Sequence, residues 1–170
     1  ADDLPSVIKQ VSGAKINGTT GPTLSFAFFD PEAISTGFAK DPRVRQAISM
    51  SLDRDSLMEL GYNVKKLRDA GIKVETPWHN LVPAGETAWW IDPVGTKMGA
   101  AGKYFKYDPK GAKDLLTAAG FANGVDAGTY QYTANRYGPL FNDIAEANAQ
   151  YMAAIGVKSS TEVQDYSSKY

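Results

Sequence analysis

The sequence predicts an α/β fold, in which helices flank a sheet, on the basis of three observations. Asp41-Pro42 and Asp108-Pro109 each precede apolar residues at helical spacing. Short segments rich in aromatic and β-branched residues are typical of strands. Near the end of the chain, strand, helix and strand follow one another as in a sheet with crossover helices. A chain of 170 residues suits one buried core, so we expect a single domain over residues 1–170.

The first thirty or so residues give the weakest secondary-structure signal. Residues 1–22 mix glycines with short apolar pieces, and we expect a loop with at most one short strand. Residues 23–29 are rich in aromatic side chains and end at Asp30-Pro31, which favours a strand that turns at the proline. Because its apolar character is partly continuous, we expect this strand to be buried on both faces.

A helix is predicted to begin at Asp41-Pro42, where the carboxylate can accept free backbone amides and proline suits the first helical position. Its apolar stripe consists of Val44, Ala47, Ile48 and Leu52. Asp53 and Asp55 can cap a continuation as far as Leu60, so one bent helix and two separate helices are both open. From about residue 61 to 104, prolines and glycines interrupt any period, and we expect a long irregular surface excursion.

The last third of the chain carries the clearest pattern. A helix is expected to begin at Asp108-Pro109 and to end before Gly120. Residues 129–133 alternate as a strand, Gly138-Pro139 opens a longer helix, and residues 157–164 are extended. We expect segments 24–29, 129–133 and 158–164 to share one sheet, with the crossover helix over residues 139–154 packed on it.

Charge and composition exclude several classes of partner and site. The formal net charge of -1 arises from 18 basic and 19 acidic residues mixed along the chain, so no nucleic acid or anionic lipid is expected as a partner. The absence of cysteine excludes disulfides, thiolate metal sites and thiol nucleophiles. The amino terminus has neither a basic region nor an apolar run, and no stretch reaches the roughly 20 apolar residues of a membrane span. Any export signal is therefore expected to have been removed or to lie outside this chain.

The sequence carries no convincing catalytic signature, and we expect a protein that is not an enzyme. It contains no G-x-S-x-G, no H-E-x-x-H and no complete Walker A motif. A hydrolase that uses carboxylates alone is the enzyme alternative, and a close pair of acids with a raised pKa in a cleft would support it. A protein-interaction module is a third class, for which a large exposed apolar patch would be typical.

Three stretches of the chain form recognisable motifs. The first runs from Asp41 to Arg54 and reads D-P-R-V-R-Q-A-I-S-M-S-L-D-R. The second runs from Tyr107 to Phe121 and includes Y-D-P-K and A-G-F, and the third ends a helix in A-I-G-V at residues 154–157. In composition, order and spacing they resemble the extracellular solute-binding proteins of family five, which include peptide- and nickel-binding members. The resemblance covers roughly residues 26–170.

The resemblance implies the second, ligand-facing lobe of a two-lobed periplasmic-binding-protein-like (type II) fold, with a mixed sheet, flanking helices and the first lobe absent. It implies the substrate-binding component of an ABC importer, which captures a peptide or a similar small solute outside the cytoplasmic membrane. An oligosaccharide, an opine or a nickel chelate is the alternative ligand. The implied partners are the ligand, the membrane subunits of the importer and the first lobe, and no cofactor is expected. The implied location is periplasmic or extracellular, either free or held by a lipoprotein anchor.

The loop between the predicted strand and the longer helix is the first candidate ligand site, because open α/β sheets commonly bind ligands there. It contains Asn135, Arg136 and Tyr137. Arg136 matches the arginine that pairs with the peptide carboxylate in dipeptide-binding members, and a guanidinium fork can hold a carboxylate through two parallel hydrogen bonds. The alternative is an ordinary loop arginine that contacts only water.

Three aromatic residues are further candidates for ligand contact. Tyr166 matches a family position where an aromatic side chain lines the pocket, and its alternative role is packing on the core at the end of the sheet. Trp89 and Trp90 lie in the irregular excursion, and neighbours in an extended segment cannot both point inward, so we expect one of them to be exposed. His79 is the only histidine; we expect it to be exposed or to cap a backbone group, and no metal site is predicted.

Overall fold

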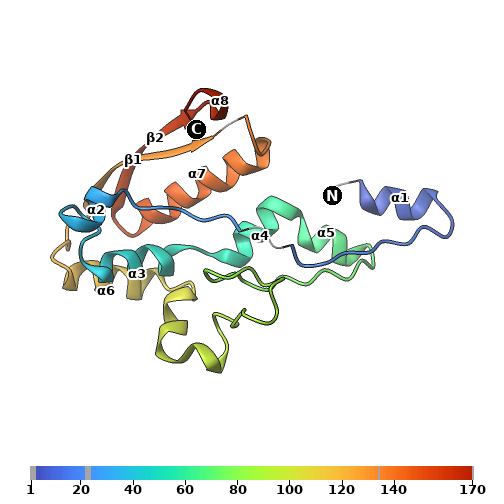
Figure 1. The fold of residues 1–170 in the computed structure, drawn as a ribbon, viewed down its shortest axis with the longest axis horizontal. Helices are drawn as coiled ribbons and strands as arrows, with labels where there is room; N and C mark the ends of the chain where they lie inside the picture. Colours follow the sequence, from blue (N-terminus) through green and yellow to red (C-terminus); the bar gives the residue numbers. More distant parts are fainter. Residues whose placement is uncertain (1–2, 22–23, 134, 170) are drawn as a thin grey trace.

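The computed structural model describes residues 3–21, 24–133 and 135–169. Its elements, in chain order, are α1 (Leu4–Gln10), α2 (Pro31–Ser35), α3 (Pro42–Ser51), α4 (Arg54–Tyr62), α5 (Val64–Asp69), the 3-10 helix η1 (Thr96–Phe105), α6 (Pro109–Ala118), β1 (Val125–Thr133), α7 (Pro139–Ala154), β2 (Val157–Gln164) and α8 (Tyr166–Lys169). Figure 1 shows a body that contains the sheet, α3, α6 and α7, from which α1 and α5 extend as an arm. None of the helices in the described ranges combines the length and the apolar character that a membrane crossing needs.

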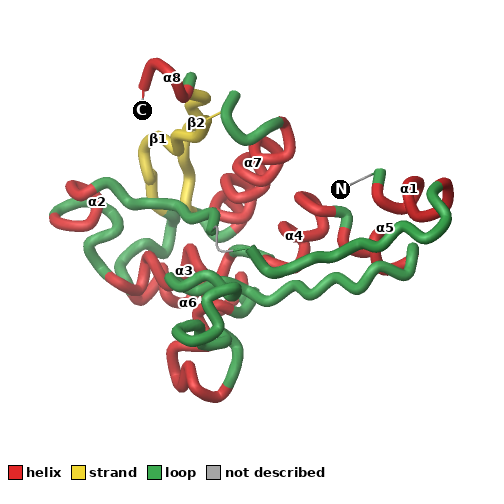
Figure 2. The backbone as a smooth tube through the Cα atoms, turned by 45° about the vertical axis from the view of Figure 1, so that its right-hand side comes forward, coloured by secondary structure: helices red, strands yellow, loops and turns green. Residues whose placement is uncertain are grey.

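The sheet consists of β1 and β2, which pair in parallel from Val125 opposite Val157 to Thr133 opposite Gln164. Helix α7 connects the two strands and contacts both of them, and Figure 2 shows it lying beside the sheet. The predicted strand–helix–strand unit is therefore confirmed, and the predicted bounds of the crossover helix are those observed. Parallel strands need such a crossover because a tight turn cannot join them.

The prediction of a third strand over residues 24–29 is wrong. These residues have no regular secondary structure, and the part of the chain that is described forms a sheet of two strands only. Phe28 is 84% exposed and contacts Phe26 edge to face, with ring centroids 4.4 Å apart. Phe29 packs against the core and contacts Phe38. The aromatic residues thus pack locally, whereas a strand needs a neighbour to accept and donate its backbone hydrogen bonds. Thr23, which begins the predicted strand, lies outside the described residues.

Three helices begin at an aspartate–proline pair, and in each of them the carboxylate accepts a backbone N–H of the first turn. The donors to Asp30, Asp41 and Asp108 are the amides of Glu32, Arg43 and Gly111, at 2.7, 2.8 and 2.8 Å. The start of α2 corrects the prediction of a simple turn at Asp30-Pro31. At Asp41, hydrogen bonds from the Arg43 guanidinium and amide lower the pKa of the carboxyl to about 2.

Between residues 42 and 62, where the sequence allowed either one bent helix or two separate helices, the chain forms two helices. Asp53 separates α3 from α4 and caps α4 by accepting the Ser56 amide at 3.1 Å.

Two segments that were expected to be irregular contain helices. Residues 4–10 form α1, with a proline in the first turn where no intrahelical amide is needed, and the excursion contains α5 and η1 between its irregular stretches.

The hydrophobic core joins the helices to the beginning of the sheet. Its buried members are Val44, Ala47, Ile48 and Met50 of α3, Ala112 and Leu116 of α6, and Ile155 and Val157 at the junction of α7 and β2. Because Val157 opens β2 and Val125 of β1 packs against the same cluster, the core anchors the amino ends of the strands. Their carboxyl ends are left at the periphery of the body (Figure 1).

Gly124→Ala is expected to lower the free energy of unfolding by about 2 kcal/mol, because alanine tolerates positive φ poorly and its methyl group would strike the backbone of Gly156, directly before β2. Gly124 has φ +86, and a β-carbon there would lie 2.5 Å from the Gly156 carbonyl oxygen. Gly13 is the matched control, since it has φ +81 but open space around the β-carbon position. Urea denaturation of both variants checks this, and a Gly124→Ala protein no less stable than Gly13→Ala would contradict it.

Candidate functional site

The carboxyl ends of β1 and β2 meet at one edge of the sheet, because the two strands are parallel. The loop that leads from β1 into α7 begins at this edge, and Asp165 and Tyr166 follow β2 directly. Helix α8 and the start of α7 lie together there, at the end of the sheet away from α3 and α6 (Figures 1 and 2).

One asparagine links the two strand ends. The side-chain Nδ2 of Asn135 donates to an Asp165 carboxylate oxygen, and the side-chain Oδ1 of Asn135 accepts the Tyr166 backbone amide at 3.0 Å. The other Asp165 oxygen accepts the Ser168 amide at 3.0 Å. The loop after β1 and the turn after β2 are therefore held in a fixed relation by Asn135 and Asp165.

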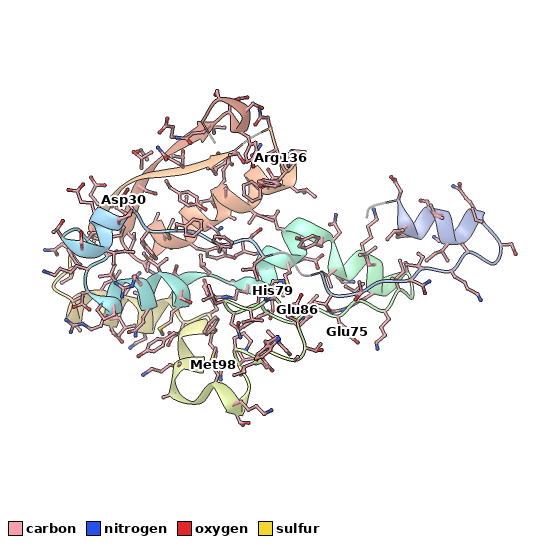
Figure 3. All side chains as sticks on the ribbon, in the orientation of Figure 1. Asp30, Glu75, His79, Glu86, Met98 and Arg136 are labelled. Carbon is pink, nitrogen blue, oxygen red and sulfur yellow. The ribbon has the colours of Figure 1, made fainter. Side chains whose placement is uncertain are left out.

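A cation and three aromatic rings gather around this link. The Cζ atom of Arg136 lies 4.9 Å from the ring centroid of Tyr166, and Figure 3 shows Arg136 near the first turn of α7. The ring of Tyr137 lies 6.2 Å from that of Tyr166 and 5.0 Å from that of Phe141. We call Asn135, Arg136, Tyr137, Phe141, Asp165 and Tyr166 the carboxyl-edge cluster. Four of the six candidate residues from the sequence belong to it.

The carboxyl-edge cluster has the chemistry of an anion site. Stacking on Tyr166 uses the face of the Arg136 guanidinium and leaves the in-plane N–H donors for another acceptor. Within the described part of the chain, the Arg136 side chain makes no hydrogen bond or ion pair. Helix α7 begins beside it without a side-chain cap, so the amides of its first turn add a positive partial charge.

Three buried side-chain oxygen atoms on the elements that carry the cluster lack a hydrogen-bond partner in the described structure, and two of them lie toward the carboxyl edge, whereas Asn148 Oδ1 lies in the second half of α7. Thr133 Oγ1 is at the last residue of β1 and Asn142 Oδ1 is near the start of α7, and neither has a hydrogen-bond partner in the described structure. Buried polar atoms are normally satisfied, so these two are additional candidates for contact with a bound molecule. Thr133, Phe141, Asn142 and Asp165 were not among the site residues predicted from the sequence. Asp165 could have been found, since it follows β2 directly at the predicted edge.

The two tryptophan candidates lie elsewhere. They belong to the excursion that precedes η1, on the side of α4 away from α7 and α8 (Figure 1). Trp89 is 78% exposed, whereas Trp90 is half-buried and its indole N–H donates to the Trp78 carbonyl at 3.1 Å. The prediction that one of the pair is exposed is confirmed, but the structure does not bring either residue to the carboxyl-edge cluster.

The single histidine stabilises the excursion. Nδ1 of His79 accepts the Ala84 backbone amide at 2.8 Å, which is the capping role expected for it. Across the described residues, no group of three or more histidine and acidic side chains is placed to hold a metal ion. Among the described carboxyl groups, those with a clearly shifted pKa are Asp41 and Glu75, and their neighbours Arg43 and Lys73 lower both values.

Comparison with known protein families gives one match over nearly the whole chain. The model of the bacterial extracellular solute-binding proteins, family 5 (middle part), matches residues 2–170. Among curated proteins, none matches this chain.

Solved structures of similar fold are much longer than this chain. The ABC transporter substrate-binding protein CtaP from Listeria monocytogenes is 22% identical with a TM-score of 0.52, over 74% of this chain and 22% of that chain. AgaA from A. tumefaciens, in complex with agropinic acid, is 24% identical with a TM-score of 0.51, over 76% of this chain and 22% of that chain. The oligopeptide-binding protein AppA from Bacillus subtilis, in complex with a nonapeptide, is 19% identical with a TM-score of 0.55, over 79% of this chain and 25% of that chain. The chain therefore spans about a quarter of the length of these proteins, and the likeness concerns the fold.

Proposed function

Since this chain belongs to the bacterial extracellular solute-binding proteins of family 5, we propose that it is the ligand-facing lobe of a substrate-binding component of an ABC importer. The ligand is a peptide or a similar small solute that carries a carboxylate. Capture takes place outside the cytoplasmic membrane, in the periplasm or at the cell surface. The other lobe and the membrane subunits of the importer are the protein partners.

The observation that carries this proposal is the carboxyl-edge cluster. Arg136 is held by stacking on Tyr166 at 4.9 Å, beside the uncapped start of α7. A carboxylate bound there would accept two parallel hydrogen bonds from the guanidinium and would lie at the positive end of the helix dipole. Tyr137 and Phe141 supply apolar surface next to this position for the remainder of the ligand.

The ligands of the structural relatives are compatible with this chemistry. AgaA was solved with an organic acid and B. subtilis AppA with a peptide, and both kinds of ligand offer a carboxylate. A peptide is the first choice, and an opine-type acid is the alternative that the same cluster would accept. An uncharged oligosaccharide would form weaker hydrogen bonds with the Arg136 donors than a carboxylate would, since the guanidinium fork matches carboxylate geometry.

A carboxylate-dependent hydrolase is the less favoured alternative. General acid catalysis at neutral pH needs a carboxyl group whose pKa is raised. The shifts found among the described acids, at Asp41 and Glu75, are in the opposite direction. The carboxylate in the cluster, Asp165, is occupied by hydrogen bonds from Asn135 and Ser168 that hold the loops together.

The 170-residue chain on its own is expected to bind peptides weakly, because Arg136 and Tyr137 are exposed and affinity depends on burying most of the ligand. A two-lobed protein that contains this chain is expected to bind the same peptides more tightly by orders of magnitude. Calorimetric titration of both proteins with di- and oligopeptides checks this. Equally tight binding by the two proteins would contradict the proposal that the site lies between lobes.

A further inference from the structure

The sequence contains two asparagine–glycine pairs, and the fold places them in opposite surroundings. Asn17 and Gly18 are exposed in a stretch, residues 14–20, that has no regular secondary structure. No atom lies within 4 Å of the position that a Gly18 β-carbon would take. Among the described residues, no hydrogen bond holds the Gly18 amide or the Asn17 side chain. No hydrogen bond or close contact among the described residues therefore restrains rotation of this peptide.

The second pair, Asn123-Gly124, lies in the tight turn between α6 and β1. The Gly124 amide donates to the Phe121 carbonyl at 3.0 Å, and the next amide, that of Val125, donates to the Gly156 carbonyl at 2.9 Å. Gly124 also has φ +86 and lies directly against Gly156. Rotation of the Asn123–Gly124 peptide would break the hydrogen bond of the Gly124 amide, and the hydrogen bond from Val125 and the close approach of Gly156 both restrain it.

Such rotation decides whether an asparagine can lose its side-chain amide. The glycine nitrogen must turn toward the asparagine Cγ and attack it. A bond forms between that nitrogen and Cγ, the bond from Cγ to Nδ2 breaks, and ammonia leaves with the proton of the glycine N–H. Water then opens the resulting cyclic imide at either carbonyl, which gives aspartate or isoaspartate. Glycine favours the reaction because it has no β-carbon to obstruct the turn and is conformationally permissive.

We propose that Asn17 is a site of spontaneous deamidation and isomerisation, and that the turn after α6 protects Asn123. Asn17 and Gly18 line a surface groove together with Ile72, Lys73 and Glu75. Lys73 and Glu75 form an ion pair with each other at 2.9 Å. Deamidation therefore adds a negative charge to a groove that already holds one cation and one anion.

The test is a time course of the folded protein at mildly alkaline pH, followed by tryptic digestion and mass spectrometry. The two sites fall in different peptides, residues 16–40 and 114–136. Replacement of the amide NH2 by OH changes the mass of the peptide, and this mass shift reports conversion. An isoaspartyl methyltransferase identifies the rearranged product. We expect Asn17 to convert at least about tenfold faster than Asn123, since every hydrogen bond that must open first lowers the reactive population several-fold.

Two controls separate the effect of the fold from that of the dipeptide. In urea, both pairs lose their surroundings, and their rates should become similar. Gly18→Ala has open space for its methyl group, so the fold is retained while conversion at Asn17 slows. Equal rates in the folded protein, an Asn17 that stays intact while the unfolded chain converts, or a difference that persists in urea would each overturn the proposal.

Discussion

Replacing Arg54 by alanine is expected to lower the free energy of unfolding by about 3 kcal/mol. The guanidinium donates to the carbonyls of Phe105 and Ser49 at 2.7 and 3.0 Å and to the Ser49 hydroxyl at 2.8 Å. Its Cζ atom also lies 5.3 Å from the ring of Phe105 and 5.8 Å from that of Trp78. Alanine would leave the Phe105 carbonyl and the Ser49 hydroxyl in a half-buried site without this donor, and would remove contacts that hold η1 to the junction of α3 and α4.

Arg43 of the same sequence motif provides the matched control. Its side chain is 43% exposed and pairs with Asp41 on the surface. The free energy of unfolding of Arg43→Ala is therefore expected to stay close to that of the parent protein. Arg54→Lys should recover part of the loss, because an ammonium keeps the charge but cannot reach all three acceptors. Urea denaturation of the three variants is the measurement. An Arg54→Ala protein as stable as Arg43→Ala would show that these contacts contribute nothing.

Helix starts were the most predictable part of the fold because their signal is local. An aspartate before a proline supplies a capping oxygen and a residue preset for the first turn. This rule gives the starts of α3 and α6, and the Gly138-Pro139 pair gives that of α7 through its proline alone. The same rule applied to Asp30-Pro31 would have predicted α2, but the aromatic residues that precede it favoured a strand and a turn.

The segment 24–29 shows why strands are harder to predict than helices. A strand requires partners elsewhere in the chain, and no pattern within so short a segment specifies whether a partner exists. Phe29 reaches the core while Phe28 is 84% exposed, so an apolar segment that crosses the surface of the body carries the same composition as a buried strand. Composition alone could not distinguish these two outcomes.

The candidate site was predictable to the extent that topology determines it. A strand–helix–strand unit with parallel strands brings the residue after each strand to one edge, and this rule places Arg136 and Tyr166 together although they are far apart in the sequence. Trp89 and Trp90 lie in an excursion without periodicity, where no such rule applies. The link from Asn135 to Asp165 depends on rotamers that the sequence does not specify.

Arg136→Ala in the complete two-lobed protein is expected to weaken binding of a carboxylate ligand by about 2 to 4 kcal/mol, because the ligand anion would be left buried without its partner. Arg136→Lys should recover only part of this, since an ammonium cannot reproduce the two-pronged geometry. Stability without ligand should change little, because the side chain is exposed and its contact among the described residues is the stacking on Tyr166. Titration calorimetry and thermal melts of the parent protein and both variants measure the two effects.

The decisive control for Arg136 changes the ligand instead of the protein. A peptide whose terminal carboxylate is replaced by an amide should bind the parent protein weakly, and Arg136→Ala should weaken it little further, because the two partners of one contact do not act additively. If the variant lost the same affinity for both peptides, the arginine would not contact the carboxylate. Unchanged affinity in Arg136→Ala would show that the residue does not belong to the site. A large drop in melting temperature would show that its stacking on Tyr166 serves to stabilise the loop.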